Sequence, residues 1–431
     1  MTLLDLFSST RSVTAARLDT AIWPRDSHYD ESGRIVVGGV ALADIAERYG
    51  TVTMVLDEHE VRGRCRAYRK AFPETEIVYA GQALLVRTVV DWVADEGLSV
   101  AVHSADELDV ALAAGVDPKR IIMHGNRESF DALVTAVDCH VGRIVAGSLA
   151  EINLLAAVAT HPQRVLLRLS ADIDVDDQPT EVARRTDFPV GAAAAAVEQV
   201  LSNPMLDLIG FHCHVGSQIY NPDYYGEAIR RMVAEMAQVR HDHGRILTDL
   251  DLGGGHAVAY RSGDAEMNLT ELAAILEDAL DAACARHRFP RPNIALEPGR
   301  GIVARAGVTL LRVRSVKHHD GGHTSVIVDS GARGGTRPAA LASTVLANRQ
   351  AAGPHRTATV AGRAGNDILA TDIRLPADLR PGDLLAVPCT GAYQHGRALS
   401  DTARLPVIAV HSGRCVELVH REPDMLDRDA G

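Results

Sequence analysis

Between residues 76 and 300, short β-branched runs alternate with longer segments of helical period, and this alternation constrains the fold more than any other feature. The candidate strands are 76–80, 98–102, 120–123, 143–146, 164–169, 208–214, 247–252 and 293–297. Segments between them, such as ADELDVALAAGV, have helical spacing and close on glycine. Eight such units over roughly 220 residues match the number and size of a (β/α)8 barrel. We therefore predict an α/β fold with a TIM-type barrel; an open doubly wound sheet is the alternative.

The pattern changes beyond about residue 305, which predicts a second domain. Segments such as VTLLRVRSVKHH and DLLAVPCTGAY are rich in β-formers and are separated by Gly, Pro and Asp turns. We predict an all-β C-terminal domain over 306–431 and a barrel over 51–305. Residues 1–50 also have strand-and-turn character, so we expect them to form an N-terminal strand segment that joins the β-domain.

Charge and composition exclude several classes of partner. The formal net charge of −12 would repel nucleic acid and anionic membranes, so we expect neither. No run of about 18 apolar residues is present, and the N-terminus lacks the pattern of a secretory signal. The six cysteines are scattered, which is typical of free thiols and predicts a cytoplasmic protein without a cysteine metal site.

Unusual sequences follow four of the predicted barrel strands, at the ends where barrel active sites lie. They are YAGQA (79–83), HCHVGSQ (212–218), DLGGG (251–255) and EPGR (297–300). Glycines after the seventh strand let the backbone approach a phosphate, although a triple glycine alone is weak evidence. His212 and His214 share one strand face, but this spacing alone is poor evidence for a metal, and we predict no metal site.

Together these motifs resemble the fold-type III, alanine racemase-like, decarboxylases that depend on pyridoxal phosphate (PLP), and most closely the diaminopimelate decarboxylases. The similarity covers nearly the whole chain. Besides the four sequences above, it rests on an early WP, HGN (124–126), VDSG…RP (328–338) and TGAY (390–393). The order and spacing of these motifs make the resemblance specific.

The resemblance implies a PLP pocket and a small amino-acid substrate, with meso-diaminopimelate converted to lysine and CO2 in the family reaction. Glu297 would face the pyridine nitrogen and His214 would stack on the ring. Arg300 and Arg337 would bind substrate carboxylate groups. The implied cofactor-binding set is His214, Ser217, Gly253, Gly254, Gly255, Glu297, Gly299 and Tyr393.

The pattern departs from the family at the residue that carries the cofactor. Active members read YAxKA, and the lysine forms the Schiff base with PLP; this chain has Gln82 at that position. A primary amide has no nucleophilic lone pair, so Gln82 cannot replace the lysine. The chain contains only three lysines, Lys70, Lys119 and Lys317, and none falls at a predicted active-site strand end.

Other catalytic positions of the family are also changed. The acidic residue expected at the end of the second strand is Ala101, and a lysine expected after HGN is absent from Arg127-Glu128. The segment whose cysteine reaches the neighbouring subunit is replaced by GRAGND (362–367), and no tyrosine follows RPA, which continues to Leu341. Pocket walls persist while catalytic groups are lost.

Three hypotheses follow from this mixture. The chain could decarboxylate with noncovalently bound PLP, or it could be a pseudoenzyme that retains the fold and regulates a partner. The resemblance implies a homodimer, and an active paralogue is the alternative partner. In the third hypothesis the pocket serves other amino-acid chemistry, with His103, His214 or His256 as acid–base groups.

Overall fold

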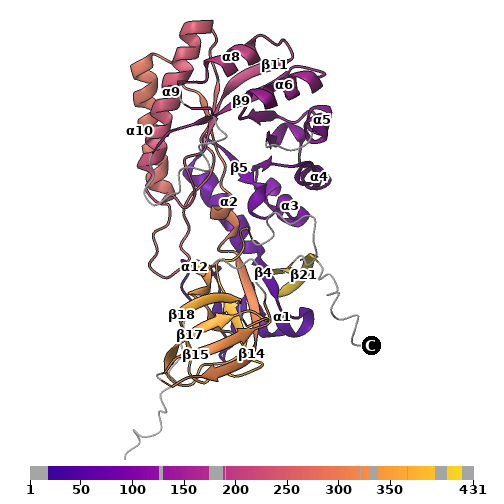
Figure 1. Cartoon of the computed structure of the whole chain (residues 1–431), viewed down its shortest axis with the longest axis vertical. Helices are drawn as coiled ribbons and strands as arrows, with labels where there is room; N and C mark the ends of the chain where they lie inside the picture. The colour runs from indigo at the N-terminus through magenta and orange to yellow at the C-terminus, as the bar shows by residue number, and fades with distance from the viewer. Residues whose placement is uncertain are drawn as a thin grey trace, which may run out of the picture.

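The structure is a computed structural model that describes residues 18–125, 130–173, 188–189, 191–320, 322–330, 338–365, 367–393 and 405–419. Figure 1 shows a barrel with its outer helices in the upper part and a β-rich domain in the lower part. No helix among the described residues is long and apolar enough to cross a membrane.

The upper domain is a closed barrel of eight parallel strands. In chain order they are β5 (Glu76–Ala80), β6 (Ser99–Val102), β7 (Ile121–His124), β8 (Arg143–Ala146), β9 (Gln163–Ser170), β11 (Leu206–Cys213), β12 (Asp249–Asp251) and β13 (Asn293–Leu296). Pairing of β13 with β5 and of β8 with β9 closes the sheet. Closure confirms the predicted TIM-type barrel and rules out the open doubly wound sheet. The two-residue strand β10 (Phe188–Pro189) adds to β9.

Helices connect successive strands and surround the barrel. They are α2 (Glu58–Ala71), α3 (Arg87–Asp95), α4 (Ala105–Ala113), α5 (Phe130–Asp138), α6 (Leu149–Val158), α8 (Ala194–Leu201), α9 (Asp223–His243) and α10 (Leu269–His287). Short 3-10 turns, η1 (Gly81–Ala83) and η2 (Pro118–Arg120), and the four-residue α11 (Arg300–Val303) complete this domain.

Two of these helices begin with the same capping arrangement, which fixes the preceding strand ends. Ser104 accepts a hydrogen bond from the N–H of Glu107 at the start of α4, and the Glu107 carboxylate accepts one from the N–H of His103. Ser148 and Glu151 repeat the arrangement at the start of α6. Reciprocal Ser and Glu caps satisfy backbone donors that a helix start would otherwise leave free.

The lower domain is built on a sheet of order β18-β17-β15-β14-β4-β20-β21; β19 pairs with β14, and β16 pairs with β19. This separate β-rich domain confirms the predicted change of fold after the barrel. Its elements are β4 (Thr53–Asp57), β14 (Gly307–His318), β15 (Thr324–Val328), α12 (Pro338–Leu341), β16 (Val345–Leu346), β17 (His355–Ala361), β18 (Ile368–Pro376), β19 (Leu384–Val387), β20 (Val407–His411) and β21 (Arg414–Val419).

The first described residues pack on this β-rich domain. They form a small sheet of β1 (His28–Tyr29), β2 (Ile35–Val37) and β3 (Val40–Ala41), followed by α1 (Leu42–Tyr49). Their buried side chains share one apolar cluster with residues of β4, β14, β19 and β20. The strand β4 falls within the range predicted for the barrel, yet it pairs with β14 and β20 in the β-rich sheet.

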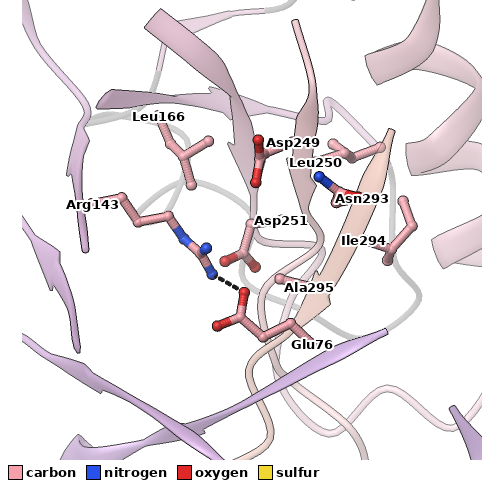
Figure 2. A pocket seen from close by; sticks show the side chains of 9 residues that line it. All are labelled: Glu76, Arg143, Leu166, Asp249, Leu250, Asp251, Asn293, Ile294 and Ala295. Carbon is pink, nitrogen blue, oxygen red and sulfur yellow. Dashed lines mark hydrogen bonds and ion pairs between the residues drawn. The ribbon is translucent and has the colours of Figure 1, made fainter. Parts of the chain in front are cut away.

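A small cavity lies at the N-terminal end of the barrel, opposite the predicted active-site end. Glu76, Arg143, Asp249 and Asn293, which line it, are the first residues of their strands (Figure 2). Arg143 forms an ion pair with Glu76. Burial raises the pKa of Asp251, another lining residue, well above its usual range, and the negative charge of Glu297 adds to this while Arg143 opposes it. The cavity is therefore part of a charged network that closes the barrel floor.

Candidate functional site

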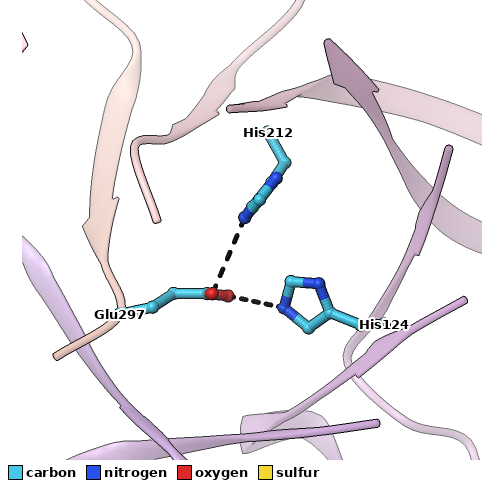
Figure 3. Close-up of side chains that lie close together, drawn as sticks. All are labelled: His124, His212 and Glu297. Atoms are coloured by element: carbon cyan, nitrogen blue, oxygen red, sulfur yellow. Dashed lines mark hydrogen bonds and ion pairs between the residues drawn. The ribbon is translucent and has the colours of Figure 1, made fainter. Parts of the chain in front are cut away.

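Glu297 follows β13 directly and lies at the centre of a histidine cluster. Its side chain is almost fully buried, and its Oε1 atom is 2.8 Å from Nε2 of His124 at the end of β7. Its Oε2 atom is 3.6 Å from Nε2 of His212 on β11 (Figure 3). Three strands thus direct these side chains toward one point at the C-terminal end of the barrel.

Burial and mutual contacts set the protonation states of these three side chains. Burial alone would raise the pKa of Glu297, but His124 and His212 outweigh it and hold this pKa well below the usual value. Burial lowers the pKa of His124, and it lowers that of His212 to about 4, against the pull of Glu297 in both cases. The arrangement is a carboxylate held by two neutral imidazoles.

A third histidine, His103, packs against this cluster. The ring of His103 stacks on that of His124, with centroids 4.6 Å apart and planes inclined by 6°. Nδ1 of His103 lies 3.7 Å from Oε2 of Glu107, the residue whose carboxylate also accepts from the N–H of His103. The capping arrangement of α4 therefore places His103 against His124.

Arg300, at the start of α11, is a buried cation close to the same strand ends. It donates to the hydroxyl of Tyr260 at 2.5 Å and to Oγ of Ser217 at 3.1 Å. Its guanidinium carbon lies 4.8 Å from the ring centroid of Tyr393. Stacking and hydrogen bonds of this kind hold a guanidinium in one orientation.

The glycine turn after β12 brings main chain from three strands into close approach. A Cβ atom on Gly254 would lie 2.2 Å from the carbonyl oxygen of Glu297, and one on Gly255 would lie 2.0 Å from that of Gly216. Gly253 has a φ of +65°, and its N–H donates to Asp251. The N–H groups of Gly254 and Gly255 donate to no other group in the described part of the chain. Two backbone donors are therefore available to an anion.

Gln82 lies in η1, directly after β5, and its side chain is exposed. The chain around it is firmly held: Ala80 donates to the carbonyl of Pro298, and the N–H of Tyr393 donates to the carbonyl of Ala83 at 2.7 Å. A Cβ atom on Gly299 would lie 2.9 Å from that of Ala83. Gln82 thus belongs to the same group of strand ends as the glycine turn and Glu297.

The three lysines lie elsewhere. Lys70 is exposed near the end of α2, and Lys119 is exposed in η2, at the N-terminal end of β7. Lys317 is exposed near the far end of β14, about 33 Å along the strand from Gly307, at about 3.3 Å per residue. No lysine of the chain lies at the C-terminal end of a barrel strand in the part that the structure describes.

The structure brings most predicted site residues to one end of the barrel, through the strand ends and loops described above. Arg337, together with Arg127 and Glu128, lies outside the described residues. Ala101 is buried among apolar residues inside the barrel. The sequence did not assign roles to His124, Tyr260 or Glu107. The end of β7, marked by HGN, was the one signal that could have pointed to His124.

The residues present fit the PLP that the resemblance implies. A pyridine nitrogen requires a buried carboxylate, which Glu297 supplies, and a phosphate requires unpartnered N–H groups, which Gly254 and Gly255 supply. The cationic Arg300, buried beside Tyr393, matches a substrate carboxylate.

Comparisons with known proteins agree with this geometry. The family model for the pyridoxal-dependent decarboxylase, pyridoxal binding domain, matches residues 58–304. The chain is 42% identical to a diaminopimelate decarboxylase of Actinosynnema pretiosum over the full length of both. It is 34% identical to that of Mycobacterium bovis, covering 93% of this chain and 95% of the relative.

Solved structures show the same fold. A protein of Aquifex aeolicus, AQ1208, superimposes with a TM-score of 0.79 at 26% identity, covering 92% of this chain and 95% of that one. A diaminopimelate decarboxylase of M. jannaschii in complex with L-lysine gives a TM-score of 0.84 at 22% identity, covering 94% and 98%. The chain belongs to the pyridoxal-dependent decarboxylase family and is similar to its diaminopimelate decarboxylases.

Proposed function

We propose that this chain is a diaminopimelate decarboxylase-like protein that binds PLP without a covalent bond and has lost efficient decarboxylation. The observation that carries the proposal is Gln82 at the end of β5, in a chain whose three lysines all lie away from the C-terminal strand ends. Glu297, the glycine turn and Arg300, which lie at the same end of the barrel, support the proposal of a PLP pocket.

In this proposal the pocket binds PLP through the groups described above. Glu297 faces the pyridine nitrogen, and its low pKa keeps a negative charge there. The glycine turn with Gly299 and Ser217 binds the phosphate, while His214 and Tyr393 flank the ring. PLP, when bound, supplies an electron sink for bonds at the substrate α-carbon. Arg300 orients an amino-acid carboxylate, and Arg337 is proposed for a second one.

Without a lysine at position 82, the protein lacks the group that attaches the cofactor and exchanges it with the substrate amine. Gln82 provides neither a nucleophile nor a base at neutral pH. The apolar environment of Ala101 adds to the loss, since this alanine stands where the family has an acidic residue. Binding groups are thus retained while proton-transfer groups are missing, which favours a catalytically impaired member of the family.

An assay of the purified chain with added PLP tests this function. CO2 release from meso-diaminopimelate is measured for the wild type and for Gln82→Lys. We expect no turnover above background in the wild type and a gain in the variant. Wild-type turnover at a rate comparable to an active relative would overturn the proposal. Spectroscopic titration with PLP measures binding separately from catalysis.

We further propose that the chain assembles as a homodimer, as its resemblance to the family implies. Light scattering after size-exclusion chromatography tests this directly. A mass of one chain would contradict the homodimer and would favour an active paralogue as the partner.

A further inference from the structure

We propose that His124, His212 and Glu297 form a binding site for a divalent transition-metal ion, with Zn2+ as the preferred ion, when PLP is absent. Such an ion would give the pocket a second ligand besides PLP. The prediction of no metal site considered only His212 with His214 on one strand. The site is formed instead from three different strands.

The ligand atoms are spaced as a metal site requires. Two imidazole nitrogens and one carboxylate oxygen lie within 4.8 Å of one another, and all three residues are buried. Oε1 of Glu297 lies 2.8 Å from His124, and Oε2 of Glu297 lies 3.6 Å from His212. Ligands at zinc distances of about 2.0–2.1 Å in tetrahedral geometry stand about 3.3 Å apart. These two separations bracket that value but involve different oxygens, so side-chain rotation must bring one oxygen and both imidazole nitrogens around a single ion.

His212 supplies an independent indication of a ligand. Its side chain is 1% exposed, and neither ring nitrogen makes a hydrogen bond within the described part of the chain. Its Nε2 atom points toward Glu297, beyond hydrogen-bond distance (Figure 3). Buried polar atoms in native proteins are normally satisfied, and a metal ion between His212 and Glu297 would satisfy this one.

The donor set selects the class of ion. Two imidazoles and one carboxylate suit Zn2+ and similar first-row ions, whereas Mg2+ and Ca2+ prefer oxygen ligands. Three protein ligands leave a fourth position open, as in catalytic zinc sites. Glu297 brings one negative charge, so an ion bound here keeps a net positive charge that can hold an anionic ligand.

The same carboxylate would face the PLP ring nitrogen, so the ion and PLP compete for Glu297. In a family member with the usual lysine, a covalent bond would favour PLP in this competition. Gln82 removes that advantage, which makes the metal-bound form accessible to this chain. The proposal therefore predicts mutual exclusion of zinc and PLP.

Zinc titration of the full chain, stripped of metal with a chelator, tests the site. Binding is measured by isothermal calorimetry for the wild type, His212→Gln and the control His256→Gln. His256 is equally buried but lies outside the triad, where Tyr68 contacts its Nδ1 atom. We expect one zinc per chain in the wild type, at least about tenfold weaker binding in His212→Gln, and less than about twofold change in the control. Absence of stoichiometric binding, or equal effects of the two substitutions, would overturn the proposal.

Zinc X-ray absorption on the wild type keeps the test decisive if His212→Gln fails to fold. We expect two imidazole nitrogens and carboxylate oxygen around the ion, and sulfur ligands or a single imidazole would overturn the proposal. A further titration with PLP should weaken zinc binding. If PLP does not bind at all, the cofactor proposal fails while the zinc measurements still decide the metal site.

Discussion

Nε2 of His124 lies 2.8 Å from Oε1 of Glu297, and this contact joins the third strand of the barrel to the eighth. Both side chains are buried, so each replaces water as the other's partner. The hydrogen bond and the nearby His212 keep the pKa of Glu297 low. The carboxylate is therefore ready for a cationic partner, whether a protonated pyridine or a metal ion.

Removal of the histidine should deprive the buried Glu297 carboxylate of a close hydrogen-bond partner. We expect His124→Leu to lower the free energy of unfolding by about 1.5–3 kcal/mol, the range for a hydrogen bond to a charged group. Urea denaturation at neutral pH measures the change. The control is His241→Leu on the exposed end of α9, for which we expect less than about 0.5 kcal/mol. Equal effects would show that the contact with Glu297 is unimportant.

The hydroxyl of Tyr260 should stabilise the protein through Arg300. We expect Tyr260→Phe to cost about 1.5–3 kcal/mol, the range for a hydrogen bond to a charged group. Tyr220→Phe is a matched control, since Tyr220 is 59% exposed. Thermal and chemical denaturation of both variants distinguish the two sites. A Tyr260→Phe variant as stable as the control would contradict the role given to this contact.

The glycine turn should not tolerate a side chain at its centre. In Gly254→Ala the new Cβ atom would lie 2.2 Å from a carbonyl oxygen of the backbone, so we expect a loss of about 1–3 kcal/mol and weaker PLP binding. Gly63→Ala on α2 is the contrasting case, because nothing beyond its chain neighbours and the backbone of its own helix lies within 4 Å of the added group. There we expect a gain of about 0.5–1 kcal/mol from higher helix propensity. Denaturation curves and PLP titration check both variants.

The buried His256 should make the free energy of unfolding depend on pH. Burial lowers the pKa of His256 to about 3 from an ordinary value of 6.5. The unfolded chain therefore takes up a proton below pH 6.5, while the folded chain does not, and stability falls as pH decreases between these values. His256→Gln lacks this contribution, so its stability relative to the wild type should improve by about 1.4 kcal/mol from about pH 7.5 to about pH 5.5. An unchanged difference would contradict a buried neutral histidine.

The barrel could be predicted well from sequence because its strands are buried on both faces. Such strands read as continuous apolar runs, and the predicted 76–80 and 143–146 coincide with β5 and β8. The strand β4 could not be placed in the same way. Its neighbours along the chain are helices, whereas its partners β14 and β20 lie more than half the chain away. Local patterns carry no information on such pairing.

The candidate site was predictable in part. Motifs at strand ends indicated Glu297, the glycine turn and Arg300, because strand ends of a parallel barrel meet at one face. The contact between His124 and Glu297 depends on which strands are neighbours across the barrel interior and on side-chain rotation. The hydrogen bond from Arg300 to Tyr260 depends on a loop conformation. Neither follows from the spacing of residues along the chain.

Borohydride reduction tests the central claim, that Gln82 leaves the chain without a covalent cofactor bond. The wild type and Gln82→Lys are incubated with PLP, reduced, digested and analysed by mass spectrometry. We expect no stoichiometric PLP modification in the wild type and modification at position 82 in the variant. Stoichiometric modification of Lys70, Lys119 or Lys317 in the wild type would contradict it.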